Sequence, residues 1–264
     1  ALADSNALNP RAYAVATGGQ TINSLVQGGN ITFTAATDRL SIASGMLTQS
    51  AGTKTIGTAG LRGELTSGLS TGELFLIKDS GAGSGGTLGA NQVHSVITDN
   101  GATRVELILN NYTRVNLTNN DFNLTANNTY TGGTVFSGGN VLYLTGASEV
   151  AGTAPIPAAL DPAKGLILNN SAVSFQGGVA QQIAAANIVT LNGGSVLTMA
   201  GANNTLAGIV FNSNGGKGNT VPTVTGGTSL TLTGHISSTP TNVAVTPLIS
   251  VALDLNGTAT HGIT

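Results

Sequence analysis

Pairs of glycine residues cut this chain into short segments, from Gly18-Gly19 near its start to Gly226-Gly227 near its end. Glycine supplies the positive φ angle that a tight corner requires. Between the pairs, apolar and polar residues alternate over about five positions, which is the period of a β-strand with one buried face. The helical spacing of apolar residues, at i, i+3, i+4 and i+7, is not sustained. The sequence therefore predicts an all-β chain of short strands.

One sequence unit recurs along the chain: a Gly-Gly pair, one or two polar residues and then a strand, as at 28–33, 138–143, 193–197 and 226–230. Pairs of Asn such as Asn169-Asn170 recur at the predicted corners. Asn tolerates left-handed backbone and can stack in ladders between successive coils. The predicted strands, which share alternating apolar side chains, are residues 21–25, 30–34, 73–77, 104–109, 140–144, 195–199 and 229–233.

Many short strands fit two architectures, a sandwich or barrel of hairpins and a solenoid that repeats one coil. The recurring unit favours the solenoid, a parallel β-helix. In a solenoid each coil contacts only its neighbours and long charged side chains have no place inside, and only 8% of the residues are charged. The few Asn-Gly turns are compatible with either architecture, so the hairpin alternative stays open.

We predict a single β-helical domain over 1–264, as a segment or mature form of a longer secreted protein. Two stretches interrupt the strand pattern. Residues 80–89 form a Gly/Ser-rich sequence that reads as a loop. Residues 151–164 contain Pro155, Pro157 and Pro162, and Pro does not fit a central strand. We therefore expect an excursion with a short helical turn there.

Composition excludes several classes of function. The chain contains no Cys, which excludes disulfides, thiolate catalysis and Cys-type zinc sites and suits an exported protein. The net charge is −2 without a basic cluster, so we expect no nucleic-acid partner. No apolar run approaches the ~18 residues of a membrane helix, so we expect no membrane insertion by this segment.

Residues 128–144 read Asn-Thr-Tyr-Thr-Gly-Gly-Thr, a few residues, Gly and then an apolar strand. This segment resembles the autotransporter-associated β-strand repeat. The resemblance implies a right-handed parallel β-helix in a bacterial surface or secreted passenger, with no catalytic residues and no cofactor. Gly139 is one glycine more than the repeat pattern has. The residues that carry the repeat motif are Asn128, Thr129, Tyr130, Thr131, Gly132, Gly133, Thr134 and Gly138.

Carboxylates are scattered rather than clustered, which argues against the acid-base or Ca²⁺ chemistry of polysaccharide lyases that share this fold. Asp79, Asp99 and Asp121, together with Asp38, lie at spacings of about one or two coils. They are candidates for a cation or sugar site on one face. The alternative is that each Asp sits at a turn and accepts hydrogen bonds from nearby backbone. His94, His235 and His261 are too far apart for a local metal motif.

We therefore expect a structural extracellular protein and not an enzyme. It would be an adhesin or matrix module at the bacterial cell surface, whose partners are its own repeats or further copies of itself. Open first and last coils, within 1–16 and 247–264, would allow end-to-end stacking into filaments. The alternative is a β-helix that binds or degrades polysaccharide or surface glycans. Tyr112, Tyr130 and Tyr143 together on one outward face would support that alternative, and their burial would count against it.

Overall fold

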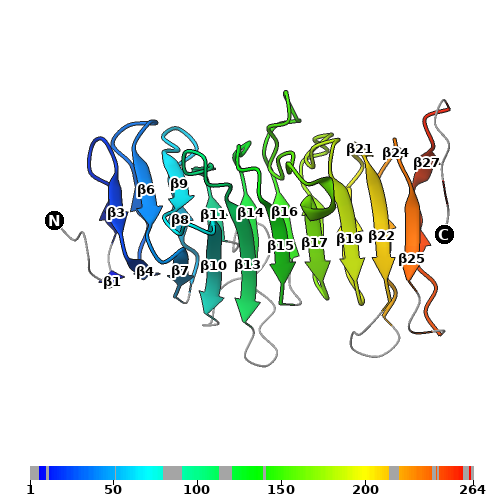
Figure 1. The fold of residues 1–264 in the computed structure, drawn as a ribbon, viewed down its shortest axis with the longest axis horizontal. Helices are drawn as coiled ribbons and strands as arrows, with labels where there is room; N and C mark the ends of the chain where they lie inside the picture. Colours follow the sequence, from blue (N-terminus) through cyan, green and yellow to red (C-terminus); the bar gives the residue numbers. More distant parts are fainter. Residues whose placement is uncertain are drawn as a thin grey trace.

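The chain folds into a parallel β-helix, as the sequence predicts, and its coils stack in chain order along the longest axis of the molecule (Figure 1). The computed structural model describes residues 6–9, 12–50, 52–79, 91–112, 121–138, 141–213, 220–239, 242, 244–257 and 262. All neighbouring strands pair in parallel. The predicted loop at 80–89 lies outside the described residues.

Two ten-stranded sheets form the main sides of the solenoid. Sheet A contains β1 (Asn6–Asn9), β4 (Ser24–Gln27), β7 (Met46–Gln49), β10 (Glu73–Asp79), β13 (Glu106–Tyr112), β15 (Gly133–Ser137), β17 (Leu166–Asn169), β19 (Ile188–Asn192), β22 (Gly208–Asn212) and β25 (Ile236–Thr239). Sheet B contains β2 (Tyr13–Ala14), β5 (Ile31–Thr32), β8 (Thr55–Ile56), β11 (Asn91–Val93), β14 (Phe122–Leu124), β16 (Val141–Leu144), β18 (Ala172–Phe175), β20 (Val196–Thr198), β23 (Thr223–Thr225) and β26 (Leu248–Ile249).

The third side of the solenoid is divided between two smaller sheets. Sheet C contains β3 (Gln20–Ile22), β6 (Arg39–Ile42), β9 (Glu64–Ser67) and β12 (Val96–Ile97) in the first coils. Sheet D contains β21 (Asn203–Leu206), β24 (Ser229–Leu232) and β27 (Ala252–Asp254) in the last coils. Between these two sheets the third side is irregular and includes the segment 151–164.

Equivalent apolar residues stack on top of one another because the parallel strands pair in register. On sheet A, Leu76 pairs with Leu47 on one side and Leu109 on the other, and all three are fully buried. The same row continues through Phe136, Leu168, Leu191 and Phe211. Buried and partly exposed residues alternate along β16 and β17, so the period read from the sequence places one face of each strand in the core.

A corner splits the predicted strand 21–25 into β3 and β4 at Asn23, which corrects the sequence prediction. The next coil turns at the equivalent place, where the N–H groups of Ala43 and Ser44 donate to the carbonyls of Ile22 and Asn23. Across this corner the buried residues Ile22 and Leu25 are three positions apart, so the period-2 alternation breaks there. The predicted strand runs through this break.

The segment 151–164 contains no strand, and a 3-10 helix, η1 (Pro162–Lys164), lies at its end. Asp161 caps η1 by accepting a hydrogen bond from the Ala163 N–H at 3.1 Å. Ile156 in the middle of the segment is fully buried and forms a parallel bridge with Ile183. The segment thus supplies core packing to the third side of its coil.

The asparagine ladder expected from the sequence is present on the outer face of sheet A. Asn192 donates to the Asn169 side-chain oxygen at 2.7 Å, and Asn212 donates to that of Asn192 at the same distance. Asn169 in turn donates to the Ser137 hydroxyl at 3.0 Å. We call Asn169, Asn192 and Asn212 the outer ladder. No described helix has the length and apolar character needed to cross a membrane.

Candidate functional sites

The repeat motif begins with a buried asparagine that joins three coils. The Asn128 side chain is 1% exposed; its oxygen accepts from the Ile97 N–H at 2.8 Å and its nitrogen donates to the Pro155 carbonyl at 2.8 Å. The Thr129 N–H donates to the Ile97 carbonyl at 2.9 Å. An amide that satisfies backbone groups on both neighbouring coils is a structural clamp.

Tyr130 and Thr131, in the middle of the motif, also make contacts within the fold. The Tyr130 hydroxyl lies 2.6 Å from the Thr134 hydroxyl inside the solenoid, and burial strongly raises the pKa of Tyr130. Thr131 donates to Asp99 through its N–H at 2.9 Å and its hydroxyl at 2.7 Å. Tyr130 is therefore absent from any outward face that could hold a sugar.

The motif glycines allow close approach of neighbouring coils. A Cβ on Gly132 would collide with the Val105 carbonyl, and one on Gly133 would collide with the Lys164 backbone. Gly138 has a φ of 120°, and a Cβ there would collide with the Asn111 carbonyl. These three positions exclude a larger residue on steric grounds.

The candidate aspartates hold backbone and side-chain donors within the fold. Asp99 accepts from the Val105 N–H at 2.7 Å in addition to Thr131. Asp121 is 5% exposed and accepts from the Val141 N–H at 3.0 Å. Asp38 accepts from the Thr34 hydroxyl at 2.5 Å and from the backbone of Gly18, and these hydrogen bonds lower its pKa. The side chain of Asp79 lies outside the described residues.

Within the described part of the chain, no three His, Asp or Glu side chains are grouped so that they could hold a metal ion. His94 contacts the Thr125 hydroxyl at 2.7 Å, and burial lowers its pKa. His235 accepts from the Gly262 N–H at 2.8 Å through Nδ1. His261 lies outside the described residues.

A second constellation, which the sequence analysis missed, lies inside the corner between sheets A and B. Three of its residues have side-chain amides that are linked one after another by hydrogen bonds. Gln27 donates to the Thr55 carbonyl at 2.9 Å, Gln49 donates to the Gln27 side-chain oxygen at 2.8 Å, and Asn91 donates to that of Gln49. We call this constellation the polar corner; its members, all 5% exposed or less, are Gln27, Gln49, Lys78, Asn91, Asn111 and Asp121.

Lys78 and Asn111 continue the same inward row. Gln49 pairs with Lys78 across sheet A, and Lys78 pairs with Asn111. The sequence does carry a signal for this row, since the alternation Leu74, Leu76, Lys78 places the lysine on the buried face of its strand. A fully buried lysine at the end of an apolar strand is uncommon and marks a position to explain.

Burial shifts the ionisation of both charged members of the polar corner. Desolvation lowers the pKa of Lys78 to about 8; the charge of Asp121 opposes this shift and that of Lys54 adds to it. Desolvation also raises the pKa of Asp121. The hydrogen bond from the Val141 N–H, the charge of Lys78 and the hydrogen bond from Tyr143 each lower it, but by less. Each group is thereby shifted toward its neutral form.

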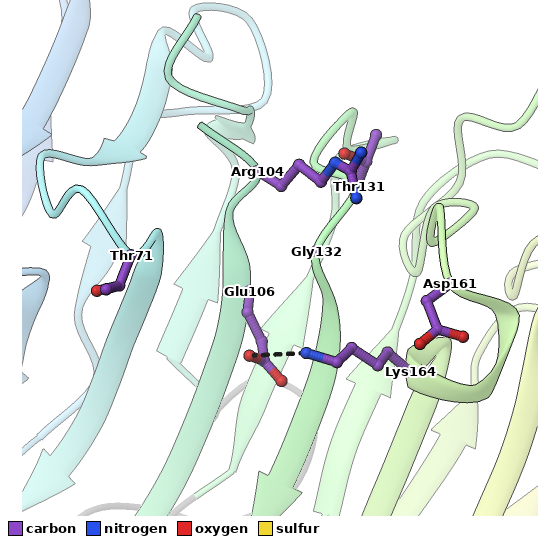
Figure 2. A pocket seen from close by; sticks show the side chains of 7 residues that line it. All are labelled: Thr71, Arg104, Glu106, Thr131, Gly132, Asp161 and Lys164. Carbon is purple, nitrogen blue, oxygen red and sulfur yellow. Dashed lines mark ion pairs between the residues drawn. The ribbon is translucent and has the colours of Figure 1, made fainter. Parts of the chain in front are cut away.

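A charged hollow of about 240 Å³ opens on the outer face of sheet A. Figure 2 shows Lys164 and Glu106 pointing toward each other across the strand that follows Gly132, with their charged atoms 3.9 Å apart. Gly133 makes this possible because the Lys164 backbone lies where a side chain would be. The hollow is lined by Thr71, Arg104, Glu106, Thr131, Gly132, Asp161 and Lys164.

The charges of this hollow largely compensate one another. Glu73 and Glu106 are neighbours in register, and Lys164 lies close enough to lower the pKa of Glu73, although the hydrogen bond from Thr71 contributes more. Lys164 is half exposed, so the ion pair adds at most about 1 kcal/mol. The hollow is smaller and more polar than an ordinary small-molecule pocket.

Comparison with known proteins identifies no relative: no family model, curated protein or solved structure matches this chain. The resemblance of 128–144 to the autotransporter-associated β-strand repeat therefore rests on those residues alone.

Proposed function

We propose that this chain is a structural module of a bacterial surface or secreted protein, a β-helical rod that catalyses no reaction and stacks end to end with a second copy of itself. The observation that carries the proposal is the uninterrupted stack of ten parallel strands in sheet A. The motif side chains, Asn128 and Thr131 among them, hold neighbouring coils together. The absence of Cys and the resemblance of 128–144 support the extracellular location.

The two ends of the rod support stacking. Within the described residues, β1 pairs only with β4, and β27 pairs only with β24. Leu248 and Leu253 in the last coil are 49% and 39% exposed. Unpaired strand edges recruit further strands. Because all strands run in the same sense, a head-to-tail contact adds a parallel coil and leaves another free edge, which produces an open filament.

Sedimentation velocity over a range of concentrations tests this proposal. We expect the wild-type chain to grow in size with concentration, and Leu253→Lys to suppress that growth because it places a charge at the last coil. Val150→Lys is the matched control, since Val150 is 68% exposed but lies on an excursion away from the ends. A monomer at all concentrations, or equal effects of the two substitutions, would contradict end-to-end stacking.

The polysaccharide alternative loses support from the tyrosines. Tyr130 is 1% exposed. Tyr143 is partly exposed on β16, but its hydroxyl is engaged by a hydrogen bond with Asp121, and desolvation together with Asp121 raises its pKa. The side chain of Tyr112 lies outside the described residues. Sugar binding uses exposed aromatic faces, so the structural role is the better supported proposal.

A further inference from the structure

Lys78 and Asn111 are direct partners on two neighbouring strands, β10 and β13. Both side chains point into the solenoid, where Lys78 is 0% and Asn111 is 1% exposed. Neighbouring strands are about 4.8 Å apart, and in-register partners present their side chains on the same face. The four-carbon stem of lysine is long enough to cross that spacing, so the amine can reach the Asn111 side-chain carbonyl.

The Asn111 amide is anomalous. Both its oxygen and its nitrogen are buried, and neither finds a hydrogen-bond partner among the described residues. Buried amides are normally satisfied, and leaving one unsatisfied destabilises the fold. The other amides of the polar corner, such as Gln49 and Asn91, are fully engaged. Among the described residues, the in-register neighbour of Asn111 that could engage its amide is Lys78.

The surroundings favour the neutral forms of Lys78 and of Asp121, the carboxyl whose charge acts on Lys78. The pKa of Lys78 falls to about 8, so about a tenth of the amine is uncharged and nucleophilic at pH 7, far more than for an ordinary lysine. Asp121 acts electrostatically on Lys78, and burial raises the pKa of its carboxyl. A carboxyl whose pKa is raised holds its proton to higher pH than usual and is better suited to act as a general acid.

We propose that Lys78 and Asn111 join in an intramolecular isopeptide bond, with Asp121 as the proton donor. The Lys78 nitrogen attacks the Asn111 side-chain carbonyl carbon, and the Asp121 proton passes to the developing oxyanion. As the intermediate collapses, the bond from that carbon to the amide nitrogen breaks. The leaving nitrogen takes up a proton lost by the lysine nitrogen and departs as ammonia. When the carbonyl re-forms, the proton on its oxygen returns to Asp121. One amide forms, one amide nitrogen leaves, and no oxidant or reductant is needed.

The bond would cross-link two successive coils of the solenoid. Lys78 ends the inward row of β10 and Asn111 that of β13, so the link spans the chain between them, including 80–90. Closing this loop covalently restricts the unfolded chain. This inference is independent of end-to-end stacking, because it concerns a bond within one molecule.

Peptide mapping of the purified folded protein tests the proposal directly. The intact chain should be lighter than its sequence mass by one ammonia. Trypsin cuts after Arg62, Arg104 and Arg114; it cannot cut after a modified Lys78. Tandem mass spectrometry should therefore find residues 63–104 joined to 105–114. Separate peptides 63–78 and 105–114 as the main products would overturn the proposal without any variant.

Variants separate this bond from other reactions that lose ammonia. Asn-Gly sites such as Asn100-Gly101 can cyclise and lose ammonia without a lysine. Lys78→Met should abolish the joined peptide, and a joined peptide that persists in this variant would contradict the proposal. A mass loss without a joined peptide is the mark of an Asn-Gly site. Lys54→Met is the matched control, since it removes another lysine whose charge acts on Lys78, and it should retain the joined peptide.

The role of Asp121 has its own test. Asp121→Asn removes the proton donor and should lower the joined fraction at least tenfold in freshly purified protein. An unchanged joined fraction would exclude Asp121 as the acid. Circular dichroism of each variant shows whether the β-helix is retained, and the wild-type map decides the main question if a variant does not fold.

Discussion

The corner that follows the sheet A strands is held by two different amide ladders along the rod. In the first coils the amide ladder points inward, through Gln27, Gln49 and Asn91, and is buried. In the later coils the outer ladder of Asn169, Asn192 and Asn212 points outward and is partly exposed. Individual bonds in the two ladders have similar lengths. The two ladders differ in what happens when a hydrogen bond is lost. Water can replace the lost bond in the outer ladder and cannot do so in the buried one.

The inward row of sheet A that contains Gln49 and Lys78 ends at Asn111. The next coil brings Gly138 against the Asn111 carbonyl, so no side chain follows in the row. The outer ladder can tolerate such an end because solvent completes it. At the end of the inner row, the Asn111 amide is buried and has no partner among the described residues, and it lies beside the buried amine of Lys78. This arrangement supports the proposed cross-link.

The largest effect should follow from breaking the inner ladder at its centre. Gln49→Met keeps the size of the side chain but leaves the Gln27 oxygen and one Asn91 donor unpartnered in the core. At about 1–3 kcal/mol for each unsatisfied buried group, we expect a loss of about 2–6 kcal/mol. Urea unfolding followed by circular dichroism measures it. A loss below about 1 kcal/mol would show that the inner ladder behaves like a solvated one.

The buried amine of Lys78 should make the free energy of unfolding depend on pH. In Asn111→Leu, which cannot form the cross-link, Lys78 keeps a folded pKa of about 8 against an ordinary value of 10.5. The unfolded chain then binds more protons between these values, so stability should rise with pH by on the order of 3 kcal/mol and be lowest below about pH 8.

The same titration in Lys78→Met, Asn111→Leu is the control and should lack this rise. Asp121, Lys54 and Tyr143 also act at this corner, and all three are present in both variants, so the comparison isolates Lys78. Because the pKa of Tyr143 is raised above its ordinary value of 10, unfolding is best compared between about pH 8 and 10. A flat profile in Asn111→Leu would contradict a buried amine.

The end of the inner row is tested by Gly138→Ala. The substitution forces a left-handed backbone on alanine and drives its Cβ into the Asn111 carbonyl, so we expect a loss of about 2 kcal/mol or more. Gly101→Ala is the matched control, since Gly101 has a φ of 61° but open space around it. It should cost about 1 kcal/mol. If the midpoint of thermal unfolding falls equally in both variants, Gly138 is not a close contact between coils.

The smallest effect should come from the outer ladder. Asn192→Leu removes the central amide between Asn169 and Asn212, yet both neighbours can turn to water. We expect a loss of less than about 1 kcal/mol by urea unfolding under the conditions used for Gln49→Met. A loss as large as that of Gln49→Met would remove the distinction between the two ladders.

The sequence predicts the strands and the outer ladder better than it predicts the polar corner. Alternation suffices for β10, and alternation together with a preceding glycine pair suffices for β16 and β24, since these features are local. The inward direction of Lys78 also follows from the alternation. Its partner does not, because Leu25, Leu47, Leu76 and Leu109 stack at unequal spacings along the chain. Pairing Lys78 with Asn111 requires the register between coils, which no local pattern supplies.

The central claim about function is that the two ends of this β-helix are complementary edges of one rod. Cryo-electron microscopy of the purified chain at high concentration tests it most directly. Ten strands of sheet A at about 4.8 Å each predict filaments with an axial repeat of about 48 Å for each copy. Isolated rods of single-molecule length at every concentration, or copies joined along their sides, would contradict the claim.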